Sequence, residues 1–164
     1  MIWRASHRFD LPARLLADRH YNRQKPGSPQ FMPPGSCRVL IASNSKAVFG
    51  LSYPKAEFVK HAWAGAWICS IFRNENAGPK ASDMIRDAMA IMQSHYDVPA
   101  LGCVTFVDPK RVPGILERGE RIEGFCFYKA GFELVGETKK GLLAWQLLPA
   151  AMPAPASISE AVRP

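Results

Sequence analysis

The stretch Tyr128-Lys-Ala-Gly-Phe-Glu-Leu-Val-Gly-Glu137 changes from a helical to an extended pattern within one short segment. A short helix over residues 125–130 would end at Gly131, because glycine readily adopts the left-handed conformation that closes helices. Phe132 then provides a core anchor, and Leu134 and Val135 begin a strand. We expect this strand, residues 132–137, to form a hairpin with residues 142–148.

A strand–loop–helix–strand unit precedes this segment. Residues 64–72 are rich in aromatic and β-branched side chains, which predicts a buried strand, and the polar residues 73–80 predict a loop. The next apolar residues recur at helical spacing, so a helix is expected from 81 to about 96: Met84, Ile85, Ala88, Met89 and Met92. Residues 101–107 predict a second buried strand, and the charged residues 110–123 predict a loop.

The N-terminal third predicts one helix and two strands. Asp10 and Pro12 are suited to start a helix that ends near Arg19-His20-Tyr21. The proline- and glycine-rich residues 25–35 predict an ordered loop, followed by strands at 38–42 and 47–53. The pattern as a whole predicts an α/β protein (α+β, with a mixed sheet), built as a single domain over 1–149 with a flexible Ala/Pro-rich tail at 150–164.

Composition restricts the function classes. The 164 residues include 21 Lys and Arg against 14 Asp and Glu, a net charge of +7, which favours nucleic acid, an acidic cofactor or a membrane surface without choosing among them. The four cysteines form no C-x-x-C pair, which argues against a zinc knuckle and a disulfide framework. We expect a cytoplasmic protein without a membrane partner, because neither a signal peptide nor a spanning segment is recognisable. G-x-G-x-x-G, P-loop and H-E-x-x-H motifs are lacking.

The Tyr-x-x-Gly-Phe element at 128–132, placed after that unit, resembles the C-terminal signature of GNAT acyltransferases. The resemblance implies a GNAT-like fold, a central mixed sheet flanked by helices, and an acyl-CoA or related donor. In that superfamily, backbone N–H groups of the strand-to-helix loop hold the donor's pyrophosphate. The segment 72–82 matches this loop, although its glycine spacing departs from the usual pattern. The donor-binding residues implied are Arg73, Asn74, Gly78, Lys80, Ala81 and Ser82.

A narrower resemblance is to the divergent Mom-type phage DNA-modification proteins, which alter the exocyclic amine of adenine. It implies catalytic roles for His20, Tyr21, Asp108 and Tyr128. Tyr128 would protonate the leaving thiolate, Asp108 would orient the amine, and His20 would act as a base. Each has an alternative: Tyr128 and Tyr21 could simply pack, Asp108 could start a turn, and His20 could cap a helix. Iron is suggested by the resemblance alone; the available ligands are too few, so we expect no metal site.

Basic residues gather beside His20-Tyr21. The nucleic-acid-binding residues expected are Arg19, Arg23, Lys25 and, as a stacking aromatic, Phe31. The alternative to nucleic-acid binding is that these basic residues form the solvated face of an amphipathic helix. Glu75 is a further candidate base. The leading hypothesis is Mom-like modification of double-stranded DNA that protects phage or mobile-element DNA from restriction. The alternatives are an acetyl-CoA-dependent N-acetyltransferase for a small-molecule or protein amine, and a binding module without catalysis. The sequence leaves open whether the protein forms a homodimer.

Overall fold

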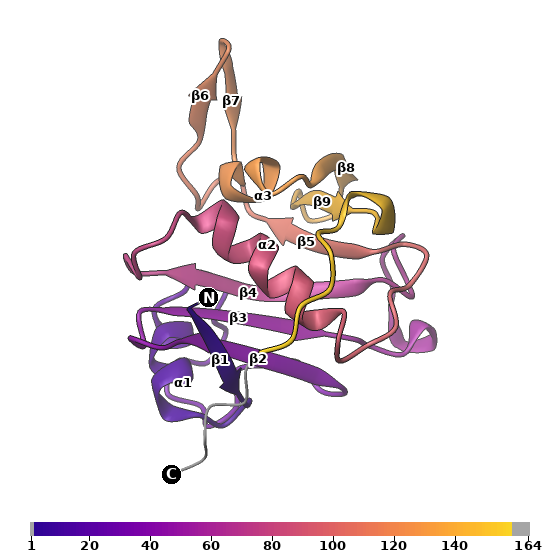
Figure 1. The fold of residues 1–164 in the computed structure, drawn as a ribbon. Coiled ribbons are helices and arrows are strands. Elements are labelled where there is room, and N and C mark those ends of the chain that lie inside the picture. The colour runs from indigo at the N-terminus through magenta and orange to yellow at the C-terminus, as the bar shows by residue number, and fades with distance from the viewer. Residues whose placement is uncertain (1, 159–164) are drawn as a thin grey trace.

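The computed structural model describes residues 2–158, and its centre is a seven-stranded mixed sheet (Figure 1). The strands lie in the order β1-β2-β3-β4-β5-β9-β8, and every neighbouring pair is antiparallel except β4–β5, which is parallel. This confirms the expected combination of helices with a mixed sheet. The bounds are β1 (Trp3–Ser6), β2 (Cys37–Ala42), β3 (Ala47–Ser52), β4 (Trp67–Asn74), β5 (Cys103–Val107), β8 (Glu133–Glu137) and β9 (Leu143–Leu147).

Helices cover both faces of the sheet. Helix α2 (Ala81–Met92) packs across one face, and its predicted apolar residues are all buried there, beside Phe49, Trp67 and Phe132. Helix α1 (Leu11–Asp18) packs on the opposite face against Val39, Ile41 and Val48. The short elements are α3 (Phe125–Lys129) and the 3₁₀ helices η1 (Ala56–Phe58) and η2 (Pro149–Ala151). No helix within residues 2–158 is long and apolar enough to cross a membrane.

Several predicted boundaries were wrong. The loop expected over 110–123 contains a hairpin, β6 (Ile115–Glu117) and β7 (Glu120–Ile122), which projects from the body of the molecule (Figure 1). These strands are too short and too charged to show a strand pattern. Strand β1 was also missed, although its Trp3 is buried and donates its indole N–H to the Met84 carbonyl. Helix α1 ends at Asp18, so His20 lies beyond the helix.

The parallel pair β4–β5 separates soon after it begins. Its paired residues are Trp67 with Cys103 and Ile68 with Val104, whereas both strands continue beyond these positions. On the other side of β4, the register with β3 shifts at Ser70, which is an extra residue in β4 and so forms a β-bulge. The diverging strands and the bulge open the sheet at its centre.

The chain after β9 lies partly along α2. The amide of Ala156 donates to the Ala90 carbonyl at 3.0 Å, and the Gln93 side chain donates to the Pro153 carbonyl at 2.8 Å. These bonds lie within the segment expected as a tail, of which residues 159–164 are outside the described residues.

Candidate functional site

A cavity of about 350 Å³ lies between the diverging strands β4 and β5. Its wall combines the chain after α1, both strands, the first residue of α2, the base of the β6–β7 hairpin and α3: His20, Tyr21, Asn22, Cys69, Ser70, Ile71, Phe72, Ala81, Thr105, Phe106, Val107, Val112, Pro113, Ile115, Gly124, Phe125, Cys126 and Phe127. A second, more open cavity of about 560 Å³ adjoins it and reaches Asp108 and Arg111. Five residues line both cavities and so separate the two compartments: Tyr21, Asn22, Cys69, Ser70 and Phe106.

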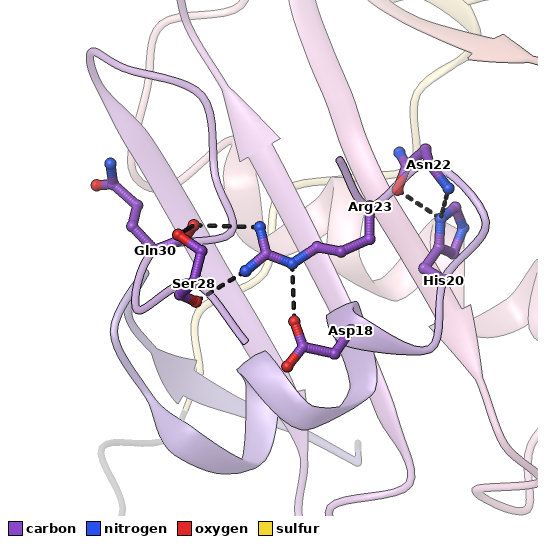
Figure 2. A network of polar contacts seen from close by, with 6 residues as sticks. All are labelled: Asp18, His20, Asn22, Arg23, Ser28 and Gln30. Atoms are coloured by element: carbon purple, nitrogen blue, oxygen red, sulfur yellow. Dashed lines mark hydrogen bonds and ion pairs between the residues drawn. The ribbon is translucent and has the colours of Figure 1, made fainter. Parts of the chain in front are cut away.

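His20 is fixed by its neighbours on the loop after α1. Its ring stacks on Tyr21 with 4.6 Å between ring centroids, and its Nδ1 lies 2.6 Å from Asn22 Oδ1 (Figure 2). The Asn22 amide nitrogen donates to the carbonyl of Ser70, the bulged residue of β4, at 3.0 Å. The amide oxygen of Asn22 therefore faces His20 and must accept a hydrogen bond from Nδ1–H. Neutral His20 consequently carries its proton on Nδ1 and a lone pair on Nε2.

A competing contact supports the opposite tautomer. The backbone N–H of Asn22 points at the same Nδ1 at 3.3 Å, and one nitrogen of a neutral ring cannot both donate and accept. The 2.6 Å contact decides between the two, because it is much shorter and the Ser70 bond fixes the orientation of the amide.

The protonation states around the cavity favour neutral groups. Burial lowers the pKa of His20, opposed in part by the bond to Asn22 and by the nearby Phe72 carbonyl, so the ring is neutral at pH 7. Burial likewise raises the pKa of Tyr21 and keeps its hydroxyl protonated. Burial raises the pKa of the Cys126 thiol to about 11 and that of Cys69 well above its usual range. Neither cysteine is therefore a thiolate nucleophile near neutral pH.

Tyr21 and Asp108 meet across 87 residues of sequence. The backbone N–H of Asp108 donates to the Tyr21 hydroxyl oxygen at 3.4 Å, which leaves the hydroxyl proton free to be donated elsewhere. Arg111 holds the same segment by donating to the Tyr21 carbonyl at 3.1 Å. The Asp108 carboxylate accepts the Lys110 amide at 3.0 Å, which is the turn-forming contact expected as its alternative role.

Tyr128 is not part of this group. It lies on α3 and lines a separate cavity of about 340 Å³ with the β7 residues and Trp145. Its side chain is 41% exposed, and its ring meets Trp145 edge-on with 6.3 Å between centroids. The structure thus brings His20, Tyr21 and Asp108 together and leaves Tyr128 on the other side of α3.

The residues expected to bind a donor lie in two places, at the end of β4 with the loop that follows it and at the start of α2. Arg73 and Asn74 organise the loop: Arg73 donates to Glu75 at 2.5 Å, and Asn74 Oδ1 accepts the Ala77 amide at 2.9 Å. Gly78 has φ +122°, and Lys80 precedes α2. Ala81 and Ser82 open α2, whose start has no side-chain cap, and Ala81 lines the central cavity. The first turn of α2, whose N–H groups have no partner within the helix, therefore begins at the wall of this cavity.

Of the residues expected to bind nucleic acid, two arginines are engaged internally. Arg23 donates to Asp18 at 2.8 Å and to the carbonyls of Ser28 and Gln30 (Figure 2). Its side chain is only 9% exposed. Arg19 binds both Glu75 oxygens, at 2.7 and 2.8 Å.

The remaining two residues of that set line a third cavity. Lys25 is exposed and Phe31 is half-buried, and both face a cavity of about 740 Å³ that also reaches Asn22 and Ser70. This cavity therefore adjoins the wall that Asn22 forms for the central one.

The candidate base Glu75 differs from the polar groups of these cavities in one respect, its low pKa. Arg19, followed by Arg73, lowers the pKa of Glu75 to about 2, so it stays ionised and is a poor base near neutral pH.

Sequence reasoning missed Asn22, Ser70 and Arg111. Asn22 follows His20-Tyr21 directly, and its amide could have been noticed as a partner for His20. The bulge at Ser70 depends on strand register, which no local pattern reveals. Within residues 2–158, no three His, Cys, Asp or Glu side chains gather as a metal site would require.

Comparison of the chain with protein-family models, curated proteins and solved structures gives no significant match.

Proposed function

We propose that this chain is a GNAT-like transferase that modifies the exocyclic amine of adenine in double-stranded DNA, in the manner of the Mom-type proteins that it resembles. The observation that carries the proposal is the cavity between β4 and β5, lined by His20 and Tyr21, with Asp108 hydrogen-bonded to Tyr21. Protection of phage or mobile-element DNA from restriction is the biological role that this resemblance suggests.

The sheet supports a GNAT-like arrangement. One parallel pair, β4–β5, lies within an otherwise antiparallel sheet, and its ladder ends at Ile68 and Val104. In GNAT acyltransferases a similar splay exposes backbone N–H groups to the carbonyl of the donor. Here the splay contains the central cavity, which gives an acyl group and an amine a place to meet.

The side chains suit transfer to a weakly nucleophilic amine. As the new C–N bond forms and the bond to the leaving group breaks, the amine must lose a proton and the leaving group must gain one. Neutral His20 has its Nε2 lone pair available to accept the first proton, because Nδ1 is bound to Asn22. Tyr21 keeps a free hydroxyl proton and can supply the second.

The start of α2 fits an acyl-CoA donor. Its first-turn N–H groups lack a side-chain cap, and such groups together with the helix dipole bind phosphate oxygens. Ala81 and Ser82 have small side chains there, and a Cβ added at Gly78 would meet no neighbouring atom. When bound, such a donor supplies an acyl group activated as a thioester.

Iron, the other group that the resemblance suggests, does not fit as well. Of the described His, Cys, Asp and Glu side chains, no three converge, and Asp108 is already committed to its turn. We therefore assign no step to a metal.

Nucleoside mass spectrometry of plasmid DNA tests the proposal. Cells expressing the protein should contain an adenosine of increased mass, and cells expressing His20→Gln should not. The mass difference identifies the transferred group. Unmodified adenosine in cells that contain the folded wild-type protein would contradict the proposal.

A second candidate is an N-acetyltransferase that uses acetyl-CoA on a small-molecule or protein amine. The uncapped N-terminus of α2 at the cavity favours it equally, since that feature concerns the donor alone. Acetyl-CoA binding by calorimetry, combined with unmodified DNA, would select this candidate.

A further inference from the structure

The wall of the central cavity carries no formal charge. No Asp, Glu, Lys or Arg within residues 2–158 is among the residues that line it. His20 is neutral and Tyr21 is protonated at pH 7, and both cysteines of the wall are thiols. Arg73 is a smaller cause than burial of the lowered pKa of His20, but its guanidinium is bound to Glu75 and does not line the cavity. The central cavity is therefore a neutral compartment.

Apolar side chains form most of this wall. They come from β4, β5, the base of the β6–β7 hairpin and α3: Ile71, Phe72, Phe106, Val107, Val112, Pro113, Ile115, Phe125 and Phe127. The Ser and Thr hydroxyls of the wall already have partners, since Thr105 donates to the Cys69 carbonyl at 3.1 Å and Ser70 shares a 2.8 Å hydrogen bond with Ser52. A charged group that entered this cavity would lose water without gaining an ion-pair partner.

The adjoining cavity of about 560 Å³ differs in charge. Besides the residues that it shares with the central cavity, it is lined by Arg23, Asp108 and Arg111. The Arg111 side chain is largely exposed there. A charged occupant would find partners in this second compartment, whereas the central cavity suits a neutral one.

The reacting end of an acyl donor belongs in the neutral compartment. The start of α2, proposed to bind the donor's phosphates, reaches this cavity at Ala81, and the groups proposed to move protons, His20 and Tyr21, line the same wall. In the transfer, the amine nitrogen attacks the acyl carbon and the C–S bond breaks. One proton passes from the amine to His20, and Tyr21 supplies one to the thiolate. The rest of the acyl group is unchanged, so any charge that it carries must stay in this cavity throughout.

We propose that the transferred group is an uncharged, predominantly apolar acyl group, and that the central cavity rejects donors whose acyl group carries a carboxylate or an ammonium. This inference rests on the proposed function and names the class of its donor. An ionised group held away from water without a partner is expected to weaken binding about a hundredfold.

Calorimetric titration with matched pairs of acyl-CoA tests the proposal, because the coenzyme A part is the same in each. Isovaleryl-CoA and malonyl-CoA have equal numbers of non-hydrogen atoms and differ by an isopropyl group in place of a carboxylate. Butyryl-CoA and β-alanyl-CoA differ by a methyl group in place of an ammonium. The wild type should bind the neutral member of each pair about a hundredfold more tightly. Equal affinity within either pair, or binding of none of these donors, would overturn the proposal.

A positive charge introduced at the rim of the cavity should relax this discrimination. Ile115 lines the cavity and is 47% exposed, so Ile115→Lys should fold and place an ammonium near the acyl group. It should reduce the ratio of isovaleryl-CoA affinity to malonyl-CoA affinity about tenfold. Leu116→Lys is the matched control, because it adds the same charge at a 73% exposed residue outside the cavity. The same ratio in both variants, each shown by circular dichroism to be folded, would overturn the role of the cavity.

The outcomes separate this inference from the proposed function. Nucleoside mass spectrometry of plasmid DNA reports on the modification itself and on the chemistry of the added group. A modified adenosine whose added group ionises near neutral pH would overturn the inference and leave the proposed function standing. Unmodified adenosine together with retained discrimination between the donors would contradict the proposed function alone. An uncharged added group together with that discrimination would support both.

Discussion

Replacing Asn22 with alanine should move the proton of neutral His20 from Nδ1 toward Nε2. In the wild type, the 2.6 Å contact to Asn22 Oδ1 holds the proton on Nδ1, and Ser70 fixes the orientation of the amide. A neutral hydrogen bond contributes about 1 kcal/mol net. Its loss should change the ratio of the two tautomers by roughly fivefold. The backbone N–H of Asn22 remains and favours the Nε2–H form.

The pKa of His20 should change in the same experiment. The bond to Asn22 raises this pKa and partly offsets the effect of burial, so Asn22→Ala should lower it further. Asn22→Asp should raise it, because a carboxylate stabilises the imidazolium.

Long-range ¹H–¹⁵N correlation spectra of the histidine rings measure both quantities without requiring any activity. His20→Gln identifies the signals of His20. His7 and His61 are internal controls, since each Nδ1 accepts a backbone N–H and should give the Nε2–H pattern in every variant. An Nε2–H pattern for His20 in the wild type, unchanged in Asn22→Ala, would refute the assigned tautomer and the role of Nε2 as a base.

Three further predictions concern stability. Arg23→Ala should destabilise the fold by about 2 kcal/mol in urea denaturation, because it removes the internal hydrogen bonds of a nearly buried guanidinium. Arg23→Lys should recover only part of this free energy of unfolding. Unchanged stability in Arg23→Ala would contradict the prediction. The hydrogen bonds from Arg19 are the main reason why the pKa of Glu75 is lowered to about 2. Ionised Glu75 therefore stabilises the fold above its unfolded pKa of about 4.3. This stabilisation is lost as the pH falls toward 2. Glu75→Gln should therefore cost up to about 1 kcal/mol at pH 7 and nothing near pH 2, and an equal loss of melting temperature at both pH values would be inconsistent. Gly102→Ala should cost more than about 3 kcal/mol, since φ is +66° and the new Cβ would lie 2.0 Å from the Leu147 carbonyl oxygen; a variant with the wild-type melting temperature would disprove the clash.

Long periodic segments could be predicted from the sequence. The stripe from Met84 to Met92 is fully buried, because the side chains of a 3.6-residue repeat fall on one face whatever the details of the sheet. Cys69 and Cys103 are buried as their apolar surroundings indicated. Gly131, with φ +101°, follows α3 as expected. In each case the local pattern and the final packing have the same cause.

Short or charged segments could not be predicted. The β6–β7 hairpin has three residues in each strand, and its stability depends on pairing across Arg118-Gly119 and on the ion pair between Glu117 and Lys129. Its alternation is too brief to separate from a polar loop. The four residues of β1 are held by β2 and by the indole bond of Trp3, which are both distant in sequence.

The candidate site was predicted in part. The resemblance named His20, Tyr21 and Asp108, and the structure brings them into contact or close proximity. The sequence could not reveal that the Arg23 guanidinium donates to carbonyls of its own loop, because a sequence does not show which backbone carbonyls lack a partner. Nor could it indicate which way Tyr128 faces, since that depends on how α3 packs beside Trp145. The roles of these residues in catalysis stay predictions.

The central claim is that His20 in the β4–β5 cavity takes part in modifying adenine in DNA. The most direct test is the fraction of modified adenosine in plasmid DNA, measured by mass spectrometry from cells that express the wild type, His20→Gln or His95→Gln at equal levels. The account predicts a modified adenosine with the wild type and with His95→Gln, whose exposed side chain lies outside the cavity, and its loss with His20→Gln. Equal modification by all three proteins, or none by the wild type, would contradict it.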